Sequence, residues 1–184
     1  MRRVIVGLLA AALSVGLAPA ALAEETVCKG TIGAKTLDNV KVPQGATCVL
    51  KGTKVKGTVK VNKNAVLDAV GVNVIGNVQG ENAKNVIVRA GSSVGGSVQV
   101  VQGSRGKVAK SKIGGDILYD EQSGLVKVRN STTGGNVQAF QNTGGVVIEK
   151  NVIGGNLQCK ENKPKPTGGG NKVDGNKEDQ CKNL

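Results

Sequence analysis

The sequence predicts an all-β protein, a single parallel β-solenoid (β-helix) of about seven coils with about 20 residues in each. Three observations predict it: a glycine repeat, an apolar alternation around each glycine, and a composition of 28 Gly in 184 residues with 1% aromatics. The glycines stand 19 or 20 residues apart, at Gly57, Gly76, Gly96, Gly115, Gly135, Gly155 and Gly175. Left-handed solenoids use shorter, six-residue motifs, which favours the right-handed form.

Each repeat is expected to contain two short strands. The first reads apolar-x-Gly-x-apolar, a period of two that places one face in a core. Its apolar positions before glycine are Val55, Val74, Val94, Ile113, Ile153 and Val173, with Thr133 in one coil. After glycine they are Val59, Val78, Val98, Ile117, Val137 and Leu157, with Lys177 in the last unit. The second strand follows about ten residues later, beyond turns such as 62–64 and 142–145 that are rich in Asn and Gly.

Stacking is what makes such a repeat stable. A unit of about 20 residues cannot bury its own apolar face, whereas stacked copies bury a continuous one. A helix is disfavoured because the apolar spacing is two and β-branched residues dominate. An antiparallel sandwich is the main alternative, but it does not require equivalent positions every 20 residues.

The N-terminus reads as a cleaved secretory signal peptide over residues 1–23, followed by the solenoid domain over 24–184. Arg2 and Arg3 precede an apolar run, and Ala21-Leu22-Ala23 resembles a cleavage site. An uncleaved anchor is the alternative. Removal of two arginines lowers the net charge from +12 to +10, and no later segment is apolar for long enough to span a bilayer. We therefore expect a secreted, extracellular protein, with association with the cell wall as the finer expectation.

The four cysteines, Cys28, Cys48, Cys159 and Cys181, are expected to form two disulfides because the chain is exported. Cys28 and Cys48 lie 20 residues apart, which is one coil, and Cys159 and Cys181 lie 22 apart. Positions one coil apart are about 4.8 Å from each other, within reach of a disulfide. These bridges would pin the two terminal coils. The cysteines lack C-x₂-C pairs and His partners, so no metal site is expected.

Two polar series accompany the repeat. A small polar residue follows each glycine: Thr58, Asn77, Ser97, Asp116, Asn136, Asn156 and Asn176. We interpret this series as a structural turn ladder, with a ligand-facing stripe as the alternative. Gln79, Gln99, Gln138 and Gln158 form a second, outward series, interpreted as a solvated face or a weak binding stripe.

The composition predicts a protein that is not an enzyme, with no catalytic residues, no cofactor and no metal. The chain has no His, and Tyr119 and Phe140 are its only aromatic residues, which disfavours sugar stacking and nucleic-acid binding. A carbohydrate-active, polysaccharide-cleaving β-helix enzyme is the alternative. Such an enzyme needs paired acids on adjacent coils, and Asp116, Asp120 and Glu121 have no such partner in register.

The two ends of the domain resemble small secreted bacterial proteins, mostly from actinobacteria. The segment 42–48 (VPQGATC) resembles their VPxGAxC opening, and 154–181 resembles their terminus GNLQC…PxPTGxGN…GNKxxQC. The resemblance covers Cys28 to Cys181 and implies a secreted parallel β-helix with no known activity. The repeats are also distantly similar to those of bactofilins, from which the signal peptide and disulfides depart.

These observations together predict an exported, non-catalytic structural or binding protein. Its charge, carried mostly by lysine, makes anionic cell-wall polymers or acidic glycans the expected partners, although lysine could also serve solubility alone. No nucleic acid is expected as a partner, and no membrane span is expected in the mature chain. Self-association through the open ends of the stack is a further alternative.

Overall fold

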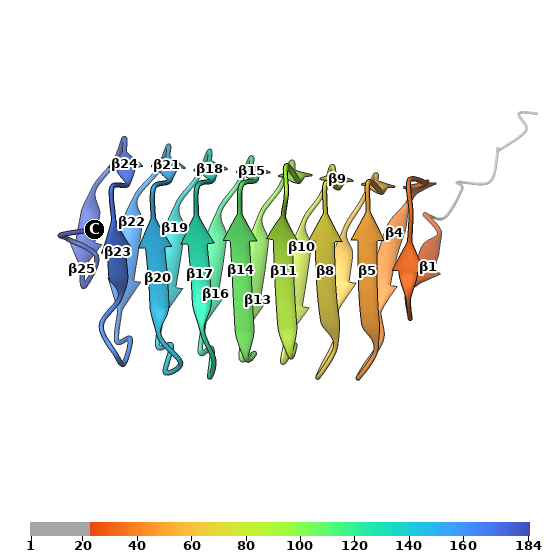
Figure 1. Ribbon diagram of the computed structural model, residues 1–184, viewed down its shortest axis with the longest axis horizontal. Coiled ribbons are helices and arrows are strands. Elements are labelled where there is room, and N and C mark those ends of the chain that lie inside the picture. Colours follow the sequence, from red (N-terminus) through yellow and green to blue (C-terminus); the bar gives the residue numbers. More distant parts are fainter. Residues whose placement is uncertain (1–22) are drawn as a thin grey trace, which may run out of the picture.

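The computed structural model describes residues 23–184, and the all-β parallel solenoid is confirmed (Figure 1). This range contains 25 strands and no helix. The predicted signal peptide lies, except for Ala23, outside the described residues. The strands form three parallel sheets, called here sheets A, B and C, that run the length of a rod.

Sheets A and B form the two long sides of the rod. Sheet A comprises β1 (Glu25–Val27), β4 (Asn39–Val42), β7 (Val59–Val61), β10 (Val78–Glu81), β13 (Val98–Val101), β16 (Ile117–Asp120), β19 (Val137–Phe140), β22 (Leu157–Lys160) and β25 (Lys177–Asp179). Sheet B comprises β2 (Thr31–Ile32), β5 (Thr47–Lys51), β8 (Val66–Val70), β11 (Asn85–Arg89), β14 (Arg105–Ala109), β17 (Val126–Arg129), β20 (Val146–Glu149) and β23 (Thr167–Gly169).

Sheet C closes the third side with strands of two residues each. They are β3 (Thr36–Leu37), β6 (Lys54–Val55), β9 (Asn73–Val74), β12 (Ser93–Val94), β15 (Lys112–Ile113), β18 (Thr132–Thr133), β21 (Val152–Ile153) and β24 (Lys172–Val173). Each coil thus has three strands instead of the two predicted. The expected strand across each glycine bends at that glycine, so Val74 ends β9 while Val78 begins β10 on another sheet.

The glycines are required at this bend because successive coils approach each other closely there. A Cβ on Gly76 would lie 2.6 Å from the carbonyl oxygen of Gly57 in the coil before it. Backbone hydrogen bonds cross the same contact, with the Gly76 N–H donating to the Gly57 oxygen (3.0 Å). The repeated glycine therefore marks a corner of the coil rather than the middle of a strand.

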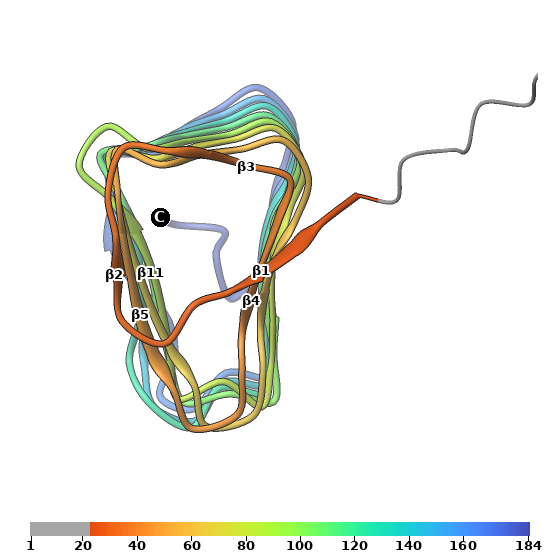
Figure 2. The ribbon, with the colours of Figure 1, turned by 90° about the vertical axis from the view of Figure 1, so that its right-hand side faces the viewer.

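The coils are triangular in cross-section and wind right-handed. Viewed from the N-terminal end, the chain passes up sheet B, across sheet C and down sheet A while moving away from the viewer (Figure 2). The repeat sets the register, so that Val78 pairs with Val98 and Val98 with Ile117. Inward side chains of all three sheets form one continuous core, which includes Val40, Leu67, Val88, Ile113 and Leu157.

Both ends of the core are covered. At the N-terminal end Glu25 pairs with Asn39, only 14 residues later, so the first coil is shorter than the rest. The Cys28–Cys48 disulfide joins this coil to the next, with 5.5 Å between the Cα atoms. At the other end Cys181 bonds to Cys159 (Cα–Cα 5.2 Å), and Leu184 packs against the core as the chain turns inside the triangle (Figure 2). Both pairings are those that the coil length predicts.

Candidate anion-binding face

Six basic side chains gather on the middle of sheet B. Outward positions alternate with buried ones along β11, β14 and β17, and register places the outward positions of the three strands side by side. The six residues, called here the basic face, are Arg89, Arg105, Lys107, Lys110, Lys127 and Arg129. Lys110 directly follows the last residue of β14. The face therefore spans three consecutive coils of a rigid sheet.

Within residues 23–184, all arginines lie on this face. Beyond the predicted signal peptide the chain has three arginines, Arg89, Arg105 and Arg129, and they lie on adjacent strands. The guanidinium group presents a planar fork of donors that suits carboxylate and phosphate, whereas lysine offers a point charge. In the sequence the charge is carried mostly by lysine, and the repeat pattern predicts no arginine cluster. The separation of Arg89 and Arg129 by 40 residues, or two coils, was the signal that could have revealed the cluster.

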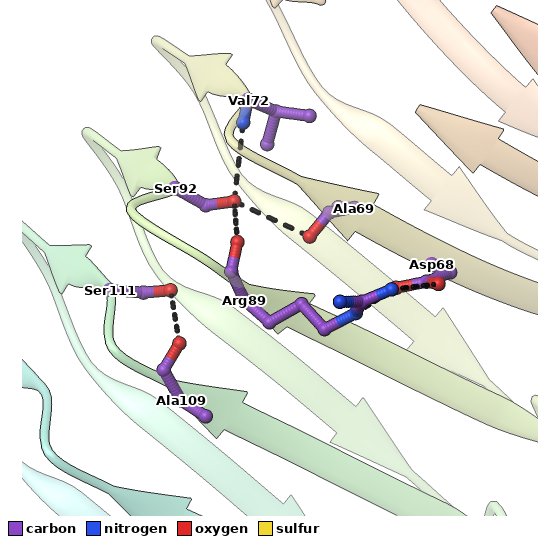
Figure 3. A network of polar contacts seen from close by, with 7 residues as sticks. All are labelled: Asp68, Ala69, Val72, Arg89, Ser92, Ala109 and Ser111. Atoms are coloured by element: carbon purple, nitrogen blue, oxygen red, sulfur yellow. Dashed lines mark hydrogen bonds and ion pairs between the residues drawn. The ribbon is translucent and has the colours of Figure 1, made fainter. Parts of the chain in front are cut away.

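Two carboxylates border the basic face without neutralising it. Arg89 donates to both oxygens of Asp68 on β8, through Nε (2.8 Å) and Nη2 (2.9 Å), as Figure 3 shows. These bonds raise the pKa of Arg89 above its usual range. On the opposite border Arg129 Nη1 lies 3.7 Å from Glu149 Oε1 on β20. Six cations and two carboxylates leave a local charge of +4.

Two hollows are cut into the basic face. The first, of about 470 Å³, is lined by Arg89, Ala90, Lys107, Ala109, Lys110, Arg129 and Asn130. The second, of about 310 Å³, is lined by Asn85, Ile87, Arg105, Gly106, Lys107, Leu125 and Lys127. Lys107 borders both, so a chain-like ligand could follow one into the other. Lys107 and Lys110 form no ion pair within residues 23–184.

The adjoining sheet A has a different surface. The predicted glutamine series lies in register and outward, with Gln79 beside Gln99 and Gln138 beside Gln158, but Leu118 interrupts it. Gln138 Nε2 donates to Gln158 Oε1 (2.8 Å) and Gln158 Nε2 donates to Glu178 Oε2 (2.8 Å). Gln138 and Gln158 thus bond along the rod, and the column continues past Gln79 to Lys60 and Lys41 in the N-terminal coils.

The small polar series after each glycine is a structural ladder, as interpreted from the sequence. Asn77 Oδ1 accepts the backbone N–H of Ser97 (2.8 Å), and Ser97 Oγ accepts that of Asp116 (2.9 Å). Asp116 Oδ1 in turn accepts the N–H of Asn136 (2.7 Å). Each side chain thus satisfies a backbone donor of the next coil and is occupied within the fold.

Two further hydrogen-bond ladders lie inside the other two corners of the coil. The glycine repeat does not predict them. At one corner Asn142 Oδ1 accepts the N–H of Gln122 (2.9 Å), and Asn162 Oδ1 accepts that of Asn142 (3.1 Å). At the other, Asn151 Oδ1 accepts the N–H of Ser131 (3.1 Å). The acceptors here belong to the later coil, the reverse of the first ladder.

Asp116 and Asp120, two of the acids that the sequence singles out, lie beside non-acidic residues of the neighbouring coils. Asp120 lies on sheet A between Val101 and Phe140 in the neighbouring coils. Burial, and then the adjacent Glu121, raise the pKa of the Asp120 carboxyl. Asp116 is held in the ladder, while Asp68 and Glu149 face arginines. Among residues 23–184, no three His, Cys, Asp or Glu side chains are grouped so as to hold a metal.

The described part of the chain contains no helix of the length and apolar character needed to cross a membrane. Comparison of the chain with protein-family models, with curated proteins and with solved structures gives no match. The resemblance to small secreted bacterial proteins therefore stays a prediction.

Proposed function

We propose that this protein is an exported, non-catalytic rod that binds anionic polymers of the cell envelope, cell-wall polymers or acidic glycans, through the basic face. The observation that carries the proposal is the gathering of Arg89, Arg105 and Arg129 with three lysines on adjacent strands. The two disulfides and the absence of a spanning helix from residues 23–184 are compatible with export.

A stacked sheet is a suitable support for such a face. Strand pairing holds the backbones of neighbouring outward residues about 4.8 Å apart, so the cations stay close to one another even when their long side chains spread. A polyanion that lies across them relieves their repulsion and gains several weak attractions at once, as linked contacts do in multivalent binding. Because most of these groups are solvent-accessible, the attraction must weaken as salt screens it.

The proposal is tested by cosedimentation of the oxidised protein, residues 24–184, with purified cell-wall material at about 50 mM and about 500 mM salt, which span weak and strong screening. We compare Lys107→Gln/Lys110→Gln/Lys127→Gln with Lys54→Gln/Lys112→Gln/Lys172→Gln. The control set removes the same charge from the exposed, outward positions of sheet C.

Wild-type binding is expected at low salt and lost at high salt. The sheet B variant should bind about tenfold more weakly, since three exposed contacts of about 0.5 kcal/mol each amount to about one decade. The sheet C variant should bind within about threefold of wild type, on the same scale. Equal losses of binding affinity in both variants would show that binding depends on net charge and not on the basic face. Absence of binding at both salt concentrations would refute the proposal.

A further inference from the structure

The first hollow of the basic face is formed by one small residue between two long ones. Ala109 pairs with Arg89 on one side and with Arg129 on the other, so both flank it at about one strand spacing. The Ala109 side chain lines the hollow but is only 7% exposed, because its longer neighbours rise around it. The hollow, called here the Ala109 notch, exists because this position lacks a long side chain.

The cations around the notch come from several directions. Arg89 and Arg129 form opposite walls, and each is restrained from its far side, by Asp68 and Glu149 respectively. Arg89 uses Nε and Nη2 for Asp68, which leaves Nη1 free to donate (Figure 3). Lys107 and Lys110 come from the central strand and the residue after it, and neither is engaged by a carboxylate of residues 23–184.

We propose that the Ala109 notch is a discrete site for a tetrahedral oxyanion, the phosphoryl or sulfuryl group of an anionic polymer. The assignment rests on the proposed function and adds the class of group that the basic face selects. A phosphoryl or sulfuryl group carries oxygens in several directions, which matches donors placed on opposite walls and on the central strand. A carboxylate has two oxygens in one plane and can satisfy only one side of this arrangement.

The charge of the notch agrees with this class. Four cations and two restraining carboxylates leave +2 around the hollow. The restrained arginines are positioned before the ligand arrives, which lowers the entropy lost on binding. The free lysines supply charge that no protein group neutralises. A phosphoryl group can enter the notch either as part of a polymer or as free inorganic phosphate, and the test must distinguish these sources.

The decisive variant is Ala109→Leu, which fills the notch and leaves all six cations of the basic face in place. Its matched control is Val147→Leu, an enlargement at a half-buried outward position of β20 on the same sheet. We would titrate the protein with inorganic phosphate, sulfate and acetate at constant ionic strength and follow NMR shifts of the Ala109 amide and the Arg129 Nε–H. Unchanged amide spectra of the remaining coils confirm that a variant is folded.

Saturable shifts with phosphate and sulfate are expected, with at least tenfold weaker binding of acetate. Ala109→Leu should lose this binding about tenfold, and so should Lys107→Gln/Lys110→Gln, while Val147→Leu keeps it. Shifts that are linear and equal for the three anions would overturn the notch, as would undiminished phosphate binding by Ala109→Leu.

The same variants separate the two proposals and the two sources. If wild type and Ala109→Leu both bind cell-wall material at low salt but phosphate binding is not saturable, the basic face is supported and the notch is overturned. If phosphate binding is saturable but the polymer does not bind, the notch is supported as a site for the free ion and the proposed envelope function is refuted. Displacement of bound polymer by inorganic phosphate at constant ionic strength would place the polymer's own phosphoryl groups in the notch.

Discussion

At the residue scale, the large side chain of Tyr119 fills the core space that Gly106 leaves empty. The two residues lie on sheets A and B, and a Cβ on Gly106 would overlap the Tyr119 ring. The only tyrosine of the chain thus enters the core where the opposite strand has no side chain. Its hydroxyl is buried and has no hydrogen-bond partner among the described residues, an arrangement that costs free energy.

We therefore expect Tyr119→Phe to raise the free energy of unfolding by about 1 kcal/mol or leave it unchanged at pH 7. Burial raises the pKa of Tyr119 above its ordinary value of 10.0, so the phenol stays protonated in the folded state. The unfolded chain binds fewer protons above that value, so wild type loses stability as pH rises past it, and Tyr119→Phe loses less. Urea unfolding of both proteins between neutral and alkaline pH checks this. A loss above about 1 kcal/mol with Phe at pH 7 would show that the hydroxyl has a partner.

At the element scale, the polar ladders inside the corners hold the coils together where the strands end. Asn142 accepts the N–H of Gln122 (2.9 Å) and donates Nδ2 to the carbonyl oxygen of Tyr119 (3.1 Å) and to Asn162 Oδ1 (2.8 Å). It is fully buried. Backbone donors at the corner therefore depend on side chains, since no strand partner reaches them.

Asn142→Ala should lower the free energy of unfolding by about 2–4 kcal/mol, because it leaves buried donors and acceptors on three coils without hydrogen-bond partners. Amide exchange at Gln122 should accelerate most. Asn73→Ala, at an exposed outward position of β9, serves as control and should change stability by less than about 0.5 kcal/mol. Equal stability of the two variants would mean that the ladder adds nothing to the sheets.

At the scale of the whole molecule, the ends of the rod need caps because their strands are paired on one side only. Interior coils pair on both sides, whereas β1 and β25 each pair on one side only within the described chain. Exposed sheet edges fray and attract other strands, and terminal repeats need caps for that reason. The short first coil, the C-terminal turn and the two disulfides supply those caps.

Replacement of Cys159 and Cys181 by Ser should cost about 3 kcal/mol in the C-terminal coil, the chain-entropy value for a loop of this length. Amide exchange should rise in residues 172–184 and stay unchanged in the central coils, because each repeat contacts only its neighbours. Replacement of Cys28 and Cys48 is the matched control and should loosen the opposite end. Uniform acceleration along the rod would show that the solenoid unfolds as one unit.

The sequence by itself determined the features that repeat along the chain. Equivalent positions of a solenoid lie one period apart, so the glycine spacing was enough to predict the coil length, the parallel register, the inward residues and the pairing of Cys28 with Cys48. The ladder formed by the side chains of Asn77, Ser97, Asp116, Asn136 and Asn156 followed from the same spacing. These features depend on the chain's own period and on the burial of an alternating apolar face.

Only the tertiary structure decided what lies across the coil and what gathers on its surface. The bend at each glycine separates sheet C from sheet A, and the three-sided coil that results has Asn142 inside a corner and Tyr119 opposite Gly106. The register of β11, β14 and β17 brings the three arginines together on sheet B. Tyr119 and Gly106 face each other across the coil, so no whole period relates them. Arg89 and Arg129 do lie two periods apart, but the period alone does not say which sheet or which face they occupy. These relations depend on how three sheets enclose a triangular core, and outward positions carry no apolar alternation that could reveal it in advance.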